Sequence, residues 1–195
     1  MRLTVLMSVL NGEDYLDEAV QSILAQSHRD FHFMIIDNGS TDSTASILAG
    51  YAQNDARVEV ITNAATVPLI AAREQGMLRA TTPWVALMDA DDFALPTRLE
   101  RQIEVLTKEG DHIGALGTYA HYMNDKGESV GTMKTGPTTS DEFRHAMITN
   151  QSMIIVDPSA IIHRQTFLDV GGYRPEYTPA GDLDLWYRIG ETGRE

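Results

Sequence analysis

Three carboxylates close together after an apolar run are the residues of this chain best suited to chemistry. Asp89, Asp91 and Asp92 follow residues 84–88, whose apolar side chains predict a buried strand. Mutual repulsion raises the free energy of the ionised carboxylates unless a cation or a hydrogen-bond donor compensates it. Carboxylates at a strand end suit a hard cation, and Mg²⁺ usually shares such a site with substrate phosphates. A solvated acidic loop between a strand and a helix is the alternative interpretation.

Two further acidic positions fall at the ends of predicted elements. Asp37 closes a second apolar run, and residues 38–42 after it combine a glycine, suited to a close approach, with residues typical of a turn. Asp182 opens the last predicted helix. Since ligands of open α/β sheets bind at the carboxyl ends of the strands, Asp37 and residues 89–92 should share one edge. Together with Asp182, these groups could bind a nucleotide and a metal-diphosphate.

The first half of the chain alternates between apolar runs typical of strands and apolar residues at the spacing of a helix. Apolar runs and helical spacing predict four strands, at 3–10, 31–36, 58–61 and 84–88, separated by helices at 14–25, after 40–43 and at 67–80. Residues 40–43 supply helix N-cap chemistry, and Pro68 suits a first helical turn. Four alternations of strand and helix predict an α/β fold with a doubly wound, mainly parallel, Rossmann-like sheet.

The pattern changes after residue 95 and predicts a smaller antiparallel portion. The expected elements are a helix opening at Pro96, a strand over 113–123, a turn at 124–127, a returning strand at 129–133, a helix at 140–149, a strand at 160–163 and a helix from Asp182. We expect one domain over residues 1–195, with a change of architecture at about residue 95. Because no closing element follows residue 195, we expect the chain to be part of a longer protein.

Composition excludes several classes of protein. Fifteen basic against 28 acidic residues give a net charge of −13, which argues against a nucleic-acid-binding surface. A phosphate-bearing substrate stays possible because a bound divalent cation reverses the local sign. The absence of cysteine excludes disulfides, thiolate metal sites and cysteine nucleophiles. No stretch approaches the ~20 apolar residues of a membrane span. The first apolar run precedes residues 11–14, which lack a signal-peptide cleavage pattern, so we expect a strand there and a cytoplasmic location.

Several segments, in order, resemble the family 2 glycosyltransferases, which are inverting enzymes of the GT-A fold with nucleotide-sugar donors. The resemblance covers essentially the whole chain. It implies one catalytic domain over residues 1–195, with residues 1–95 binding the nucleotide and residues 96–195 on the acceptor side. It is carried by residues 9–16 as the opening strand and turn, 37–42 as the acidic nucleotide-binding turn, Asp89-Ala90-Asp91 as a DxD motif, and 171–173 and 182–186 as the acceptor-side segment.

The resemblance implies a role for each matching residue. The nucleotide would bind against Val9, Asn11, Glu13, Asp37, Arg73, Asp89 and Ala90. Asp37 would accept a hydrogen bond from the base, and Asp89 would contact the ribose. Asp91 would bind the divalent metal, Mn²⁺ or Mg²⁺, that bridges the diphosphate. Asp182 would be the general base that deprotonates the acceptor hydroxyl.

The chain departs from the family pattern at two positions. The family commonly has Glu-Asp before the last helix, whereas this chain has Gly181-Asp182, so Asp184 is the fallback base. Ser8 stands where proline or threonine is common. Asp92 would help to orient the acidic group.

The implied activity is transfer of a sugar from a nucleoside-diphosphate donor, with a UDP type favoured, to a hydroxyl of a glycan or lipid-linked acceptor. Synthesis of cell-surface or extracellular polysaccharide is the expected context, and the protein could lie against the inner face of the membrane. A dehydrogenase would need G-x-G-x-x-G after the first strand, and a nucleotidyltransferase a glycine-rich basic loop; residues 11–16 provide neither. A catalytically silent nucleotide-sugar-binding module is a further alternative, favoured by Gly181 alone.

Some of these residues also have purely structural interpretations. Asp42 is favoured as a helix cap. Trp84 and Trp186 are expected to pack in the core, and His163 is expected to be structural. Arg73 could equally be a surface residue, because exposed arginine is the norm.

Overall fold

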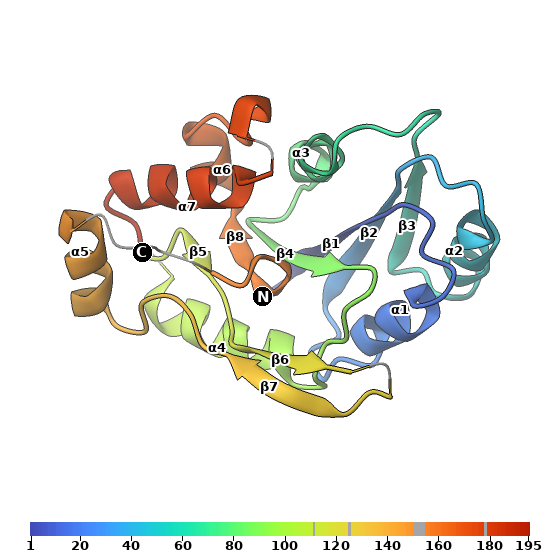
Figure 1. Cartoon of the computed structure of the whole chain (residues 1–195), viewed down its shortest axis with the longest axis horizontal. Helices are drawn as coiled ribbons and strands as arrows, with labels where there is room; N and C mark the ends of the chain where they lie inside the picture. Colours follow the sequence, from blue (N-terminus) through green and yellow to red (C-terminus); the bar gives the residue numbers. More distant parts are fainter. Residues whose placement is uncertain (111, 125, 150–154, 178) are drawn as a thin grey trace.

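A central six-stranded sheet organises the protein (Figure 1). The computed structural model describes residues 1–110, 112–124, 126–149, 155–177 and 179–195. The sheet contains β1 (Leu3–Val9), β2 (Phe31–Asp37), β3 (Val58–Thr62), β4 (Trp84–Asp89), β5 (Ala115–Leu116) and β8 (Ile161–His163). Their order is β3-β2-β1-β4-β8-β5. The first four strands are parallel to one another, whereas β8 is antiparallel to both of its neighbours.

The helices cover both faces of this sheet, which makes the fold doubly wound. They are α1 (Leu16–Leu24), α2 (Thr44–Asn54), α3 (Leu69–Arg79), α4 (Arg98–Glu109), α5 (Ser140–Thr149), α6 (Arg164–Asp169) and α7 (Gly181–Glu191), with 3₁₀ turns η1 (Asp157–Ser159) and η2 (Pro175–Tyr177). Helices α1, α2 and α4 pack on one face and α3, α6 and α7 on the other. In Figure 1 the second group lies above the sheet and α1 and α4 lie below it. The predicted α/β class and doubly wound, mainly parallel sheet are confirmed.

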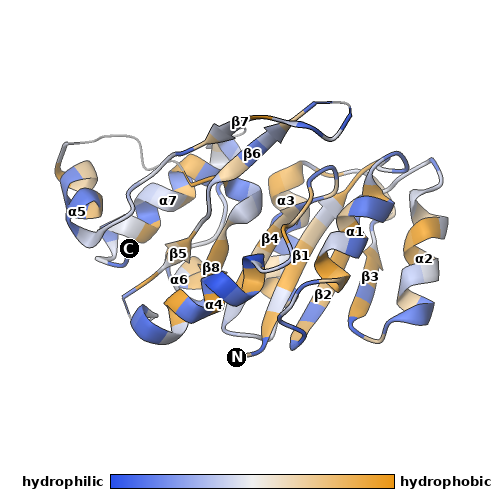
Figure 2. Ribbon diagram, turned by 90° about the horizontal axis from the view of Figure 1, so that it is seen from below, coloured by the Kyte–Doolittle hydropathy of each residue, from blue (hydrophilic) through white to orange (hydrophobic). Residues whose placement is uncertain are grey.

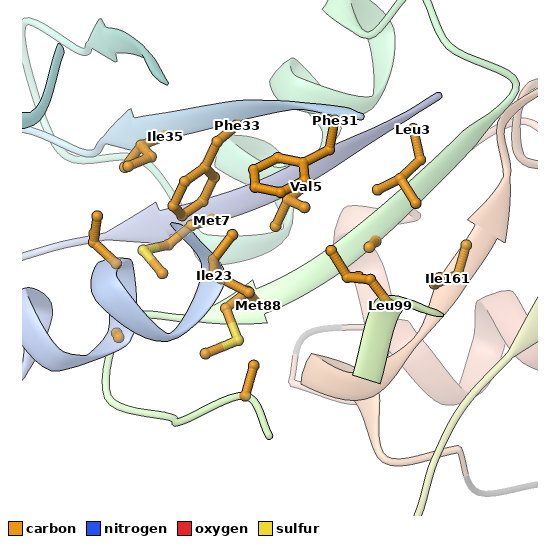
Figure 3. Close-up of a cluster of buried hydrophobic side chains, with 14 of the residues drawn as sticks. Leu3, Val5, Met7, Ile23, Phe31, Phe33, Ile35, Met88, Leu99 and Ile161 are labelled. Carbon is orange, nitrogen blue, oxygen red and sulfur yellow. The ribbon is translucent and has the colours of Figure 1, made fainter. Parts of the chain in front are cut away.

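Alternating side chains of the strands supply the two cores. Val5 and Met7 of β1 and Phe33 of β2 point to the face covered by α1, where Ile23 meets them (Figure 3). Leu6, between them in sequence, belongs to the core under α3 and α7. Both faces of β1 are therefore buried, which explains why its sequence is an almost continuous apolar run.

The strand order creates a switch point at the carboxyl end of β1. The chain moves outward from β1 to β2 and β3, then crosses back through α3 to place β4 on the other side of β1. A ligand can enter the crevice where the direction of winding changes. The N terminus lies at the opposite end of the sheet, as Figure 2 shows.

The predicted continuous strand over residues 113–123 is wrong. The segment divides into β5 and a second strand, β6 (Ala120–Met123), which belongs to a separate sheet. Gln102 donates to the carbonyl of Leu116 (2.9 Å), and the backbone NH of Thr118 donates to the hydroxyl of Ser159 (2.9 Å). Side chains thus take the backbone groups that a longer strand would have paired, and the chain leaves the main sheet.

The predicted return strand is confirmed as β7 (Ser129–Met133), which pairs with β6 in an antiparallel hairpin. Asn124 closes the turn by accepting from the backbone NH of Gly127 and, through its side chain, from that of Glu128. Asp125 of the predicted turn lies outside the described residues. The hairpin projects at the same end of the molecule as the carboxyl ends of the parallel strands (Figure 2).

Two further helices differ from the prediction. Helix α4 begins at Arg98, two residues after Pro96, and α6 was not predicted. Helix α6 is short and is capped by His163, whose Nδ1 accepts from the backbone NH of Thr166 (3.3 Å). None of the helices in the described part of the chain combines the length and the apolar character that crossing a membrane requires.

Candidate active site at the carboxyl edge of the sheet

Asp37 and Asp89 flank the carboxyl end of β1. Asp37 pairs in register with Val9 of β1, and Asp89 pairs with Ser8. Because neighbouring strands lie about 4.8 Å apart, the two backbones are separated by roughly 10 Å. Ser8 lies between them, and its buried hydroxyl has no hydrogen-bond partner among the described residues. The structure therefore brings the two predicted nucleotide contacts to one edge, on either side of the switch point.

A tight turn holds the carboxylate of Asp37. Its Oδ1 accepts from the backbone NH of Ser40 (3.0 Å), and the residue is almost fully buried. Gly39 adopts a positive φ of 81°, and a Cβ there would lie 2.9 Å from the backbone nitrogen of Thr66. Glycine is therefore required both by the conformation and by the close approach of the loop after β3.

Asn38, which the sequence analysis did not single out, ties this turn to the next loop. Its Oδ1 accepts from the backbone NH of Val67 (3.1 Å) and from Nδ2 of Asn63 (3.0 Å). Its own Nδ2 donates to the carbonyl of Val67 (2.8 Å). One buried amide thus fixes the loops after β2 and β3 to each other. Its position beside Asp37 was the only available signal in the sequence.

The loop after β1 is fixed to the start of α2 in the same way. The backbone NH of Thr41 donates to Oδ1 of Asn11 (2.8 Å), and that of Ser43 donates to Oε2 of Glu13 (3.0 Å). Asp42 accepts from the backbone NH groups of Thr44 (3.0 Å) and Glu13 (3.2 Å). Ser43, and not the predicted Asp42, occupies the N-cap position of α2, but Asp42 still accepts from the first backbone NH of the helix. The hydrogen bonds from Thr44 lower the pKa of Asp42 more than burial raises it.

The remaining predicted nucleotide contacts lie at the same edge. Val9 is buried at the end of β1, and Ala90 is half-buried directly after β4. Asn11 and Glu13 keep exposed surface beside them, but their side-chain oxygens hold the neighbouring loop. In the structure, Asn11 and Glu13 therefore hold together the loops that form this edge.

Arg73 joins two carboxylates beneath this edge. It comes from α3, its side chain is only 7 % exposed, and its Nη2 donates to Oδ1 of Asp89 at 2.6 Å. Its Nη1 forms an ion pair with Oδ2 of Asp157. Burial disfavours the charged guanidinium, but Asp157 and Asp89 outweigh it and raise the pKa of Arg73. The interpretation of Arg73 as an exposed surface residue is wrong, because α3 turns it into the protein.

Asp157 is a site residue that the sequence analysis missed. It lies in η1, and antiparallel β8 carries this turn to the carboxyl end of β4, where the backbone NH of Leu87 donates to the carbonyl of Ala160 (2.8 Å). Burial raises the pKa of Asp157 to about 6, against the opposing effect of Arg73, and the charges of Asp89 and Asp182 add to the rise. Two carboxylates, Asp89 and Asp157, therefore pair with one guanidinium, and Asp182 lies close enough to affect the pKa of Asp157.

The acidic turn after β4 has a second, half-buried cation below it. Arg98 donates through Nη2 to the carbonyl of Leu87 (2.7 Å). Burial lowers the pKa of Arg98 to about 10, and Asp92 and Asp89 oppose that shift. The pKa of Asp92 is raised, because neighbouring protein partly desolvates it and the charges of Asp89 and Asp91 lie close by. Arg73 and Arg98 thus supply the compensating cations that the cluster of carboxylates requires.

Asp182 belongs to the same electrostatic group as Asp157. It lies in the first turn of α7, and its charge raises the pKa values of Asp157 and Tyr173, although burial is the larger cause for both. A Cβ at Gly181 would lie 3.2 Å from Cγ2 of Ile70, so α7 packs closely on α3 where the family commonly has glutamate.

Asp184, the fallback base, is held by other residues. Its Oδ2 accepts from Nε of Arg188 (2.8 Å), and its Oδ1 lies 3.5 Å from Nη1 of Arg174. The carboxylate is 10 % exposed. These contacts fix it within α7, which leaves Asp182 as the better placed of the two.

The residues at the edge suit a metal shared with a ligand. Asp91 is exposed in the turn directly after β4, and its carboxylate is a hard oxygen donor. Among the described residues, no group of three or more aspartate, glutamate or histidine side chains is gathered as a complete metal site. A cation with one or two protein carboxylates and several phosphate oxygens does not need such a group.

The two predicted core residues and the predicted structural histidine occupy the expected places. Trp84 and Trp186 are buried. The ring of His163 packs on Trp84 with centroids 4.9 Å apart, at the amino-terminal end of β4 and away from Asp89.

A cavity of about 470 Å³ lies between α4, β5 and α5, lined by Val105, Tyr119, Pro137 and Phe143 among others, and contains none of the predicted site residues.

Comparison with known proteins identifies the family. The sequence model described as "Glycosyl transferase family 2" matches residues 4–171. The chain belongs to glycosyl transferase family 2. An uncharacterized glycosyltransferase of Haemophilus influenzae is 27 % identical over 98 % of this chain and 61 % of its own length. Other family relatives include the putative glycosyltransferase EpsE of Bacillus subtilis, 29 % identical over 98 % of this chain and 68 % of its own length.

Some relatives of this family 2 chain carry names from polysaccharide synthesis. The O-antigen biosynthesis glycosyltransferase WbnJ of Escherichia coli is 28 % identical over 96 % of this chain and 71 % of its own length. The chain spans only about three fifths of the first curated relatives it matches.

Solved structures confirm the GT-A fold. A mannosyltransferase of Pyrobaculum calidifontis, in complex with GDP-Man and Mn²⁺, superposes with a TM-score of 0.74 at 18 % identity and covers 99 % of this chain and 53 % of its own. TarS of S. aureus, residues 1–349 in complex with UDP-GlcNAc, gives a TM-score of 0.76 at 18 % identity, covering 97 % of this chain and 53 % of its own.

Proposed function

We propose that this chain is the catalytic domain of an inverting glycosyltransferase that uses a nucleoside-diphosphate sugar. The observation that carries the proposal is the placement of Asp37 and Asp89 on either side of the carboxyl end of β1, at the switch point of a family 2 fold. Residues 1–95 would bind the nucleotide, and residues 96–195 would face the acceptor. The names of the relatives support synthesis of a cell-surface or extracellular polysaccharide.

The donor would lie along the edge formed by β2, β1 and β4. Asp37 would accept a hydrogen bond from the base, and Asp89 would accept from the ribose. Asp91, together with the phosphates of the donor, would hold Mn²⁺ or Mg²⁺, which as a Lewis acid stabilises charge on a leaving diphosphate. The hydrogen bonds among the loops after β1, β2 and β3 hold this edge in place before the donor arrives.

Asp182 would remove the proton of the acceptor hydroxyl as its oxygen attacks the anomeric carbon. A single displacement breaks the glycosidic bond to the diphosphate, forms the new bond on the opposite face and inverts the anomeric centre. A positioned carboxylate of this kind contributes ~10²–10⁴-fold to the rate. Asp184 is held by arginines, so it should not replace Asp182.

Donor turnover followed by proton NMR tests the proposal. UDP- and GDP-sugars are incubated with the protein and Mn²⁺, and the anomer of the released sugar is recorded before mutarotation. We expect α-linked donors to give the β-sugar first, and Asp182→Asn to slow turnover by about 100-fold or more while donor binding persists. Retention of the anomer, or full activity of Asp182→Asn, would contradict the mechanism. Donor binding without hydrolysis, and without transfer to any of the acceptors then added, would identify a catalytically silent module instead.

A further inference from the structure

We propose that Asp157 is a positioning residue that holds Arg73 against Asp89 and thereby fixes the carboxylate that would bind the donor ribose. The inference rests on the proposed function, because it concerns the binding of the donor. Arg73 uses Nη2 for Asp89 (2.6 Å) and Nη1 for Asp157. The two ends of the guanidinium are thus occupied by carboxylates from different parts of the chain.

Exposure separates the roles of the three side chains. Arg73 is 7 % exposed and Asp157 is 15 % exposed, whereas Asp89 is 32 % exposed. A ligand at the edge of the sheet can therefore reach Asp89 more readily than the two groups behind it. Arg73 and Asp157 act on such a ligand through Asp89.

The guanidinium transmits position because its geometry is fixed. Its NH groups lie in one rigid plane, so an acceptor at one end determines the direction in which the other end donates. Asp157 fills one end and prevents the side chain of Arg73 from rotating. The other end then holds Oδ1 of Asp89 in one orientation.

The turn that contains Asp157 is fixed by hydrogen bonds to the rest of the fold. The carbonyl of Ser159, at the end of η1, accepts from Nε2 of buried Gln102 in α4 (2.9 Å). The next carbonyl, of Ala160, accepts from the backbone NH of Leu87 in β4 (2.8 Å). The contacts therefore run from α4 and β4 through η1 to Arg73, and from Arg73 to the edge of the sheet.

Direct contact between Arg73 and the diphosphate is the competing arrangement. For that contact the guanidinium would have to leave both carboxylates and move out of the core. Asp157 would stay behind as a buried charge without its partner, and such a charge is strongly unfavourable. We therefore assign Arg73 to the support of Asp89.

The ribose hydroxyls provide a specific test. Isothermal titration with Mn²⁺ compares UDP or GDP, whichever binds more tightly, with its 2′,3′-dideoxy analogue. Wild-type protein should prefer the ribonucleotide by about tenfold or more, the worth of a charge-assisted hydrogen bond. Asp157→Ala should weaken the ribonucleotide and leave the dideoxy analogue almost unchanged, so that the preference falls to about twofold or less. Asp157→Asn, which keeps an acceptor oxygen for Arg73, should restore most of the preference.

Two further variants complete the experiment. Asp55→Ala removes a carboxylate paired with Arg57 (2.7 Å) before β3 and should leave the preference unchanged. The ammonium of Arg73→Lys cannot hold both carboxylates in one plane, so this variant should lose the preference for the ribonucleotide. It replaces Asp157→Ala in the experiment if that variant does not fold.

Equal weakening of both nucleotides by Asp157→Ala, or an unchanged preference in Asp157→Ala or Arg73→Lys, would overturn the positioning role and leave the proposed function intact. Wild-type protein that binds neither nucleotide would overturn both proposals.

Discussion

Replacement of Arg73 by methionine should destabilise the protein in a pH-dependent manner. Methionine is unbranched and apolar, so it can fill much of the buried space but leaves Asp89 and Asp157 without their shared cation. Removing one partner of a buried ion pair typically costs about 3–5 kcal/mol. Because Asp89 is 32 % exposed and can be hydrated, we expect the lower end, about 3 kcal/mol at pH 7.5.

The pH dependence follows from the protonation of Asp157. Burial already raises its pKa to about 6, and loss of the Arg73 charge raises it further. Above pH 6 the folded variant therefore binds a proton that the unfolded chain, with a carboxyl pKa of about 4, has released. Stability then falls as pH rises. The difference between wild type and variant should grow from pH 6 to pH 8 and shrink below pH 6.

Arg57→Met is the matched control. Arg57 pairs with Asp55 at 2.7 Å, but both side chains are about a quarter exposed, at 24 % and 25 %. The hydrogen bond from Arg57 lowers the pKa of Asp55, so this pair stabilises the fold above pH ~4 and is lost only below it. Arg57 also packs over the ring of Phe31. Arg57→Met should therefore lower the free energy of unfolding by about 1–2 kcal/mol, by the same amount from pH 5 to pH 8.

Urea denaturation, followed by the fluorescence of buried Trp84 and Trp186, measures both variants at pH 5, 6, 7 and 8. A loss below about 1 kcal/mol for Arg73→Met, close to that of an exposed pair, would refute the reasoning. So would a loss that stays constant across this range, or one that increases on acidification.

Three further predictions concern the supports of the edge and the metal. Gln102→Leu leaves two backbone carbonyls, the buried one of Ser159 and the half-buried one of Leu116, without their donor. It should lower the free energy of unfolding by about 2–4 kcal/mol in urea, and a change below 1 kcal/mol would contradict this role. Glu13→Ala removes the acceptor for the backbone NH of Ser43 and should cost about 1 kcal/mol, with faster hydrogen exchange at that amide; unchanged exchange would argue against the contact. Asp91→Ala should abolish the Mn²⁺ dependence of nucleotide binding in isothermal titration, and equal dependence in both proteins would exclude Asp91 as a ligand.

The parallel half of the fold could be predicted because its signals are local. Both faces of β1 and β4 are buried, so their sequences are apolar runs, and turn residues such as Gly39 mark where strands end. The break between β5 and β6 has no such local signal. It depends on Gln102 and Ser159, which lie far from the break in sequence.

The same distinction applies to the candidate site. Asp37 and Asp89 each follow an apolar run, and parallel strands bring such positions to one edge. Asp157 reaches that edge only because β8 runs antiparallel beside β4. The sequence of a three-residue strand does not indicate whether the strand pairs in a parallel or an antiparallel direction. The contact of Arg98 with the end of β4 could not be predicted for a similar reason, because it depends on how α4 packs under β4.

A crystal structure with UDP or GDP and Mn²⁺ would test the central claim most directly. We expect one nucleotide at the carboxyl edge of β2, β1 and β4, with its base at Asp37, its ribose at Asp89 and the metal at Asp91. A nucleotide bound elsewhere, for example in the cavity of about 470 Å³ between α4 and α5, with these three carboxylates free of ligand, would contradict the account.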